Sequence, residues 1–301
     1  MGTAITATAV STDPAVRSSI QHASVAANVC LRSAGVRPEQ IDLLINTGVY
    51  RDSNMAEPAM AALIQKNVGM NLDYIKDPVP HAGFSFDLMN GACGVLNAVQ
   101  VAGAFLAAGN AEYALVVSSD AHPSGSTTPV AGFPYATVGA AMLLHRTVDG
   151  ETGFGSVHTA GSAEGTAGAA GYMDLPNAGT RGREVITIDR DADYTGRLVA
   201  FAAAQARRHA EAEGVDLART LLIASQPTPT FGADVAGLLG IAPDAVVTVD
   251  GVDGDPHSSA LTLAYHQAVA SGQVTRYPQV LFLAAGAGLT AACSFYRPDG
   301  S

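Results

Sequence analysis

The most informative stretch of the chain passes from a hydrophobic strand through a turn of small residues into a helix, and it reads Phe86-Asp-Leu-Met-Asn-Gly-Ala-Cys93-Gly-Val-Leu-Asn-Ala98. At such a turn the first N–H groups of the helix are unpaired and the helix dipole is positive, which stabilises a thiolate and an oxyanion. The pattern makes Cys93 a candidate acyl-transfer nucleophile, with a pKa below the free value of about 8.5. The alternative is a small buried side chain, as most free cysteines are.

Composition limits the classes of function that this site could serve. The chain has 301 residues, 48% of them hydrophobic and 14% charged, which is enough for a large core and argues against disorder. The formal charge is −11 and Lys/Arg clusters are absent, which argues against nucleic acid or an anionic membrane as a partner. The three cysteines are far apart and lack CxxC spacing, which predicts a reducing compartment without a disulfide frame or a metal site. The sequence shows neither a secretory signal nor an apolar run of about 18 residues, so we expect a cytoplasmic protein.

Short apolar runs alternate with alanine-rich helical stretches, which is the pattern of an α/β fold. Because the strands are short and continuously apolar, we expect helices on both faces of the sheet. The expected strands cover residues 5–10, 43–46, 85–88, 114–118, 140–145, 153–159, 221–224, 245–249, 280–284 and 291–297, and the expected helices cover residues 16–34, 57–68, 94–108, 196–212, 231–239 and 258–270.

The two halves of the chain end alike. In residues 115–145 and again in residues 281–295, a buried strand leads through a turn into a second strand that opens on small residues. A repeat with a period of about 150 residues indicates two copies of one α/β unit, which we place at residues 1–150 and 151–301. The helices after Cys93 and after Asp255 would then be equivalent and point their N-termini at one central site. Two unrelated α/β domains with similar ends are the alternative.

These residues carry a resemblance to the thiolase superfamily, specifically its ketoacyl-ACP synthase III branch. The resemblance lies in residues 86–109, 118–120, 222–241 and 255–290, and its most specific part is Gly286-Ala-Gly-Leu-Thr290. Residues 46–51 and 56–59 resemble the olefin-forming head-to-head condensing enzymes of that branch. The resemblance implies a duplicated five-layer α/β/α/β/α fold, a dimer through the edge of the first half, and acyl transfer from acyl-CoA or acyl-carrier protein without a cofactor.

The chain departs from the family at each catalytic position. Counting without a gap from Asp87 places Ala92 at the position of the catalytic cysteine, and Cys93 follows one residue later; a one-residue insertion at Gly91 would restore the match. The family histidine falls on Ser225, and serine cannot replace an imidazole as a base near neutral pH. The family asparagine falls on Asp255.

Other residues offer replacements for the missing groups. His257, two residues after Asp255, is predicted to be the base for Cys93, with Asp255 as its orienting partner. The resemblance assigns the oxyanion hole to the N–H groups of Cys93 and Ala287. Glu57 matches an acid that enters the partner subunit's active site in the olefin-forming enzymes, or it is a first-turn helix acid. His81 and His122 are placed on surface loops.

Two hypotheses follow for the function. In the first, the chain is an acyltransferase or condensing enzyme in which Cys93 is acylated and His257 accepts and donates the protons. In the second, it is a catalytically degenerate subunit that pairs with an active ketosynthase homologue, so that the dimer would be a heterodimer rather than a homodimer. Substitutions at Ala92, Ser225 and Asp255 fit the second, whereas a cysteine and a histidine beside the vacated positions fit the first.

Overall fold

The computed structural model describes residues 2–70, 83–126, 130–147, 152–163, 168–174, 176 and 179–299. Its strands are β1 (Gly2–Ser11), β2 (Leu43–Asn46), β3 (Phe84–Asp87), β4 (Tyr113–Asp120), β5 (Val138–Thr147), β6 (Gly153–Phe154), β7 (His158–Gly161), β8 (Ala169–Tyr172), β9 (Thr187–Arg190), β10 (Thr220–Ala224), β11 (Gln279–Gly286) and β12 (Thr290–Arg297). Its helices are α1 (Ser19–Ala34), α2 (Met60–Val68), α3 (Gly94–Ala107), α5 (Tyr194–Glu213), α6 (Phe231–Leu239) and α7 (Ala260–Ala270).

The described strands other than β8 and β9 form one sheet built from two matching halves. In the first half, β2 runs parallel to β3 and β4, and β5 pairs antiparallel with β4 and β1. In the second, β10 runs parallel to β11, and β12 pairs antiparallel with β11 and β7. The short strand β6 joins the halves between β1 and β12. The two halves therefore repeat one strand order.

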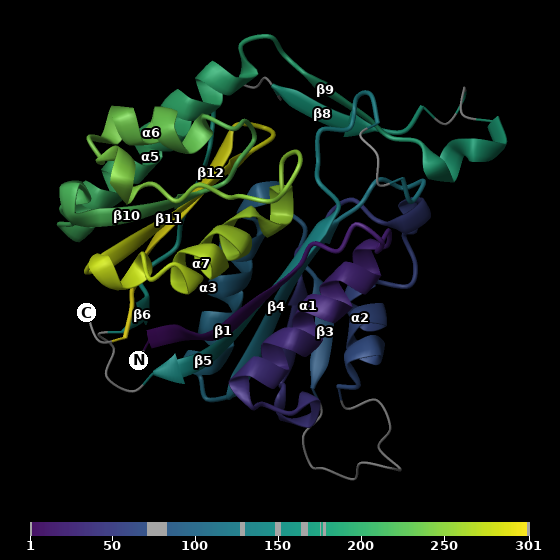
Figure 1. Cartoon of the computed structure of the whole chain (residues 1–301), viewed down its shortest axis with the longest axis horizontal. Coiled ribbons are helices and arrows are strands. Elements are labelled where there is room, and N and C mark those ends of the chain that lie inside the picture. Colours follow the sequence, from purple (N-terminus) through teal and green to yellow (C-terminus); the bar gives the residue numbers. More distant parts are fainter. Residues whose placement is uncertain are drawn as a thin grey trace.

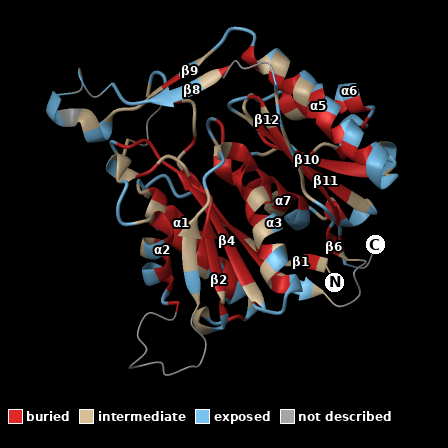
Figure 2. Cartoon of the chain, turned by 180° about the vertical axis from the view of Figure 1, so that it is seen from behind, coloured by how far each residue is buried: buried red, intermediate tan, exposed pale blue. Residues whose placement is uncertain are grey.

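Helices cover both halves of the sheet in layers. Figure 1 shows α3 and α7 side by side in the middle, α1 and α2 on the outer face of the first half, and α5 and α6 on the outer face of the second. Figure 2 shows that burial is concentrated on the strands and on α3 and α7. The predicted five-layer α/β/α/β/α fold is confirmed. The predicted boundary at residue 150 falls outside the described residues.

Side-chain alternation along the strands explains the layers. In β2, Leu43 and Ile45 face the central helices, whereas Leu44 packs into the outer core beneath α1 and α2. In β11, Phe282 faces the central layer and Leu283 the outer core beneath α5 and α6. Each fully buried Leu, Ile or Phe side chain contributes about 1.5–3 kcal/mol of transfer free energy, so both faces of every central strand favour this arrangement.

Several predicted elements differ from the structure in their bounds, and three of them have a clear physical reason. The strand expected at residues 245–249 is reduced to one parallel bridge between Leu222 and Val246, because the 3₁₀ turn Pro243–Ala245 directly precedes it. The strand expected at residues 153–159 is split into β6 and β7, which pair with different parts of β12. Helix α2 begins at Met60 rather than Glu57, because the Asp87 carboxylate accepts hydrogen bonds from the Met60 and Ala61 N–H groups and caps the helix there.

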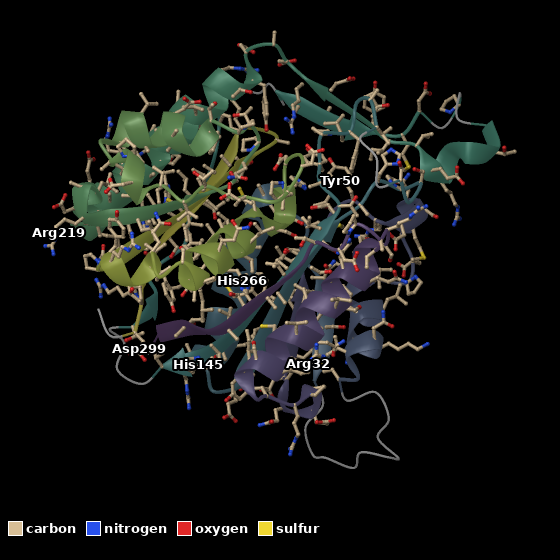
Figure 3. All side chains as sticks on the ribbon, in the orientation of Figure 1. Arg32, Tyr50, His145, Arg219, His266 and Asp299 are labelled. Carbon is tan, nitrogen blue, oxygen red and sulfur yellow. The ribbon has the colours of Figure 1, made fainter. Side chains whose placement is uncertain are left out.

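A two-stranded arm of β8 and β9 extends above the sheet (Figure 1) and pairs antiparallel within itself. β9 ends at Arg190, whose side chain reaches the site described below. Tyr50 lies at the same end of the molecule as this arm, whereas His145 and Arg32 lie toward the opposite end (Figure 3). The arm therefore brings β8 and β9 to the end of the sheet where Tyr50 lies, although the arm and Tyr50 are far apart in the sequence.

We predict that the chain dimerises through β3. In the described part of the chain this strand pairs only with β2, and Phe84 on it is 45% exposed. A free edge strand with an exposed aromatic ring offers both backbone partners and apolar area to a second copy. Light scattering should give a mass near twice 30.6 kDa for the chain, and Phe84→Glu should shift it toward the monomer. Leu238→Glu, which charges an exposed apolar position on α6, should leave the dimer intact. A monomeric parent chain would contradict this prediction.

Candidate functional site

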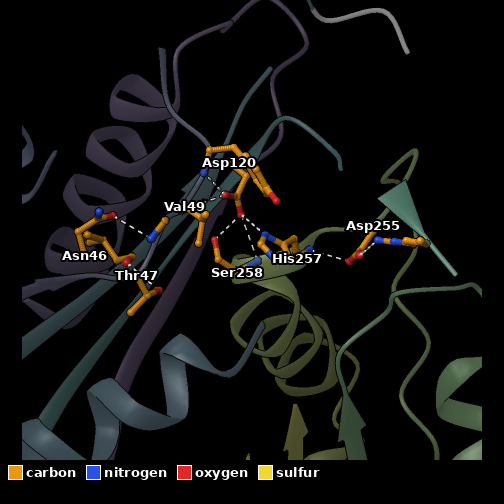
Figure 4. Close-up of polar contacts among 11 residues, drawn as sticks. Asn46, Thr47, Val49, Asp120, Asp255, His257 and Ser258 are labelled. Atoms are coloured by element: carbon orange, nitrogen blue, oxygen red, sulfur yellow. Dashed lines mark hydrogen bonds and ion pairs between the residues drawn. The ribbon is translucent and has the colours of Figure 1, made fainter. Parts of the chain in front are cut away.

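The site lies where the N-termini of α3 and α7 meet at one end of the sheet. Each helix is preceded by a three-residue 3₁₀ turn, Gly91–Cys93 before α3 and His257–Ser259 before α7. The first residues of these turns face each other, because a Cβ atom built on Gly91 would lie 3.2 Å from Nε2 of His257. The expectation that two equivalent helices point at one site is therefore met in the geometry (Figure 4).

The duplication extends to the backbone of these turns. Gly91 has φ of 51° and His257 has φ of 46°, both in the left-handed region. Glycine adopts that conformation without strain, whereas for histidine it is uncommon and costs free energy. Non-glycine residues persist in such a conformation only where their surroundings fix them, so the contacts of His257 are of particular interest.

Asp120 is the central acceptor of the site. It ends β4, its side chain is fully buried, and one carboxylate oxygen accepts hydrogen bonds from the N–H groups of Val49 and Tyr50 at 3.0 and 2.8 Å. The other oxygen accepts the Ser258 N–H at 3.1 Å and the Ser258 hydroxyl, and it lies 3.1 Å from Nδ1 of His257. Burial by itself would raise the pKa of Asp120, but His257 and these donors outweigh it and hold the pKa below its usual value.

His257 is the matching cation. Burial lowers its pKa, but the Asp120 carboxylate, with a smaller effect from Asp255, outweighs this and raises the pKa above 6.5. Since Nδ1 lies against an ionised carboxylate, it carries the proton, and the tautomer is fixed. Nε2 is then the nitrogen directed toward Gly91 and the turn before α3. The arrangement is a buried His–Asp dyad whose free nitrogen faces the centre of the site.

Asp255 fixes the backbone of His257 rather than its ring. Its Oδ1 accepts the His257 N–H at 2.8 Å, and its Oδ2 lies 3.6 Å from Nη2 of Arg190 (Figure 4). Burial raises the pKa of Asp255 to about 6, although His257 and Arg190 partly offset it. The prediction that Asp255 orients the imidazole is therefore wrong in its detail, because Asp120, which arrives from the first half, takes that contact.

Cys93 faces the central core. It is 1% exposed, lies among the buried residues around α3, and its Sγ is 3.8 Å from the Thr290 carbonyl oxygen. Burial raises the pKa of Cys93 to about 12, with a small opposing effect from a hydrogen bond with the Ala292 backbone. The expectation of a lowered pKa is wrong, because desolvation of the thiolate in an apolar core outweighs the favourable dipole at the start of α3.

The positions that match the family's catalytic cysteine and histidine carry small side chains, or side chains that bond to the backbone. Ala92 is 5% exposed, and its Cβ lies 3.8 Å from where a side chain on Gly286 would begin. Ser225 is buried at the end of β10, and its hydroxyl accepts the Ala285 N–H at 3.0 Å and contacts the Ala285 carbonyl at 3.3 Å. Ala287 is exposed in the turn between β11 and β12, so its assignment to an oxyanion hole stays a prediction.

Glu57 and His122 are separate from this dyad. Glu57 is exposed ahead of α2, and its entry into a partner subunit's site stays a prediction. His122, expected on the surface, is buried, with Nδ1 2.7 Å from the Ser124 hydroxyl and its ring edge-on to Phe133. His81 lies outside the described residues.

Sequence reasoning did not assign Asp120, Tyr135 or Arg190 to the site. The Tyr135 ring packs against the His257 ring at 4.2 Å between centroids with a tilt of 33°, and it stacks on Tyr50 at 4.8 Å. The Arg190 guanidinium lies over the rings of Tyr135 and Tyr194, and its Nη1 donates to the Pro227 carbonyl at 3.2 Å. An acid at the end of a buried strand was a signal that could have identified Asp120, whereas the other two arrive from loops and the arm.

Relatives in sequence share one name. The chain is 25% identical to the beta-ketoacyl-[acyl-carrier-protein] synthase III of Solibacter usitatus, over 90% of this chain and 82% of that protein. A stretch of 98 residues, 33% of the chain and 26% of the relative, is 34% identical to an acyl-CoA:acyl-CoA alkyltransferase of Xanthomonas campestris pv. campestris. No protein-family model matches the chain.

Solved structures show the same fold. The 3-oxoacyl-[acyl-carrier-protein] synthase III of Aquifex aeolicus superposes with a TM-score of 0.79 at 19% identity, over 98% of this chain and 100% of that one. OleA of Xanthomonas campestris superposes with a TM-score of 0.79 at 17% identity, over 99% and 98% of the two chains. The chain therefore has the fold of these condensing enzymes. Within that class, the resemblance to the ketoacyl-ACP synthase III branch is confirmed.

The described residues lack two further features. Among them, no group of three or more His, Cys, Asp or Glu side chains is arranged to hold a metal ion. None of the helices formed by these residues is long and apolar enough to cross a membrane.

The burial of the cysteines predicts their reactivity. Because the pKa values of Cys30, Cys93 and Cys293 are all raised to about 12, the native protein should react slowly with iodoacetamide at pH 7.5 at all three positions. Peptide mass mapping should show rapid labelling of each only after unfolding in urea. Rapid labelling of Cys93 in the native protein, with Cys30 and Cys293 protected, would contradict this prediction and restore Cys93 as the nucleophile.

Proposed function

We propose that the chain transfers an acyl group from an acyl-CoA or acyl-carrier-protein thioester directly to an acceptor, with the His257–Asp120 dyad as its proton-transferring group. The observation that carries this proposal is the placement of Nε2 of His257 against the turn before α3, with Nδ1 held by a buried carboxylate. Names of relatives that act on acyl thioesters support the substrate class. Their identity to this chain is low, so the substrate is part of the proposal.

Transfer without an acyl-enzyme accounts for the departures from the family. Position 92 carries no sulfur, and a Cys93 thiol with a pKa of about 12 forms little thiolate at neutral pH. In the proposed step the neutral Nε2 takes the proton of the acceptor's hydroxyl or amine as it attacks the thioester carbonyl. The C–S bond then breaks, and the same proton passes from Nε2 to the departing thiolate. Atoms and charges balance without a cofactor.

The pH dependence has a defined sign. Because Asp120 raises the pKa of His257 above 6.5, the ion-paired form persists to a higher pH than in a free imidazole, and the base form increases as the pH rises. Turnover should therefore increase with pH through the pKa of His257.

His257→Ala should lower thiol release from acyl-CoA by about a hundredfold to ten-thousandfold, the usual effect of removing a general base. Thiol release with a panel of acyl-CoAs and hydroxyl or amine acceptors measures this, and circular dichroism checks the fold. Cys93→Ala and Ser225→Ala should each retain turnover within a few fold. Intact mass should show no acyl adduct on the parent chain. A stable adduct that maps to Cys93 would overturn direct transfer and favour the acyl-cysteine route of the first hypothesis.

A second candidate is the catalytically degenerate subunit, which Ala92 and the structural role of Ser225 favour. It predicts no thiol release by the chain alone with any acceptor. It further predicts a stable heterodimer with an active ketosynthase homologue, whose activity rises on mixing. His257→Ala would then leave that stimulation unchanged, which separates the two candidates in one set of measurements.

A cysteine at position 92 tests whether this residue occupies the position of the family's catalytic cysteine. Ala92 neighbours Gly91, which faces His257, and its Cβ lies close to the turn at Gly286. A thiol there would sit beside an imidazolium, which lowers thiol pKa values. Ala92→Cys, made in a Cys93→Ala background, should gain one acyl mass from acyl-CoA and lose it again in combination with His257→Ala. An unmodified Ala92→Cys chain would show that residue 92 does not occupy the nucleophile position.

A further inference from the structure

We propose that Tyr135 is a positioning residue that holds the His257 imidazole over the site in its protonated, Asp120-paired orientation. The proposal deepens the proposed function, on which its catalytic meaning rests. The first observation is the stack itself, in which the ring centroids of Tyr135 and His257 are 4.2 Å apart with an interplanar angle of 33°. An aromatic face at this distance attracts a cation, and desolvation strengthens the attraction.

The loop that carries Tyr135 is tied to the residue that fixes the backbone of His257. Asp255 donates its N–H to the Pro134 carbonyl at 3.0 Å and accepts the Ala136 N–H at 2.8 Å through its own carbonyl. The Asp255 side chain at the same time accepts the His257 N–H. Because one residue is bonded on both sides of Tyr135 and to the His257 N–H, the backbone segments that carry the two rings are held together.

Tyr135 is in turn braced by its neighbours. Tyr50 stacks on it at 4.8 Å, Phe133 packs edge-on at 5.3 Å, and the Arg190 guanidinium lies 5.6 Å from its ring centroid. Tyr50 also lies 5.5 Å from the His257 ring. The imidazole is thus enclosed by Asp120 along its Nδ1 edge and by tyrosine rings on its face. The positive φ of His257 is a strained conformation that such an enclosure can maintain.

The charges that face His257 come from three segments, and they determine in which direction its pKa shifts. Asp120 from β4 and Asp255 from its own loop raise the pKa of His257, whereas Arg190 from β9 and burial lower it. The Tyr50 and Tyr135 hydroxyls are neutral near pH 7, since burial raises their pKa values. The ring of Tyr135 therefore acts on His257 through stacking, and a phenyl ring should serve equally well.

The test measures the His257 titration by NMR in the full chain, with His257→Gln used to assign its resonance. Tyr135→Leu should lower the pKa of His257 by about one unit, the shift expected when a desolvated cation–π contact is lost. Tyr135→Phe should restore the parent value. Phe84→Leu removes a ring on β3 that packs on Phe86 and Phe105 instead of on this group, and it should leave the pKa unchanged. If Tyr135→Leu does not fold, Tyr135→Met takes its place.

An unchanged His257 pKa in the aliphatic variant would overturn the proposal. Equal shifts in the Phe and Leu variants would overturn it as well, because they would assign the effect to the hydroxyl and its contact with Arg190. The titration needs no substrate, so it succeeds or fails independently of turnover. If the pKa values behave as expected while His257→Ala retains thiol release, the proposed function fails and the positioning role of Tyr135 stands.

Discussion

The buried carboxylate of Asp120 is the contact on which the rest of the site depends. It ends a strand of the first half, yet its donors include His257 and Ser258 from the turn that begins α7 in the second half. A fully buried charge is costly unless it is paired and hydrogen-bonded, and removing one partner of such a pair typically costs about 3–5 kcal/mol. The two halves must therefore dock in one register for this charge to be satisfied. The two halves therefore form the Asp120–His257 pair when they pack against each other.

The repeated arrangement of strands and helices explains why the site is central. Each half supplies a helix whose 3₁₀ first turn lies at the end of parallel strands, and the two turns meet with Gly91 facing His257. The halves have diverged at these matching positions, one carrying the smallest side chain and the other an imidazole in a conformation that glycine prefers. The two matching positions therefore lie in close contact, since even a Cβ atom on Gly91 would lie 3.2 Å from Nε2 of His257.

Much of the fold could be predicted, because continuous apolar strands buried on both faces leave a strong pattern, and β2 and α6 match their expected bounds. The strand expected at residues 245–249 failed because an apolar run cannot reveal that a turn at Pro243 leaves only one bridge. The expected lowering of the Cys93 pKa was wrong for a related reason. Its place at a helix start was visible in the sequence, but the direction of its side chain depends on one residue of register. Facing the core, the same thiol has a raised rather than a lowered pKa.

The sequence by itself determined the α/β class, the repeat and the presence of His257 beside the position of the family asparagine, since these are properties of pattern and local spacing. The tertiary structure alone decided which acid pairs with that histidine. Asp120 lies 137 residues away and Asp255 only two, yet a side chain two residues away is better placed to accept the backbone N–H than to reach the ring. The partners that set the charge and orientation of His257 come from β4, from the loop of Tyr135 and from the arm of Arg190. Their convergence is a consequence of packing, which no local pattern in the chain encodes.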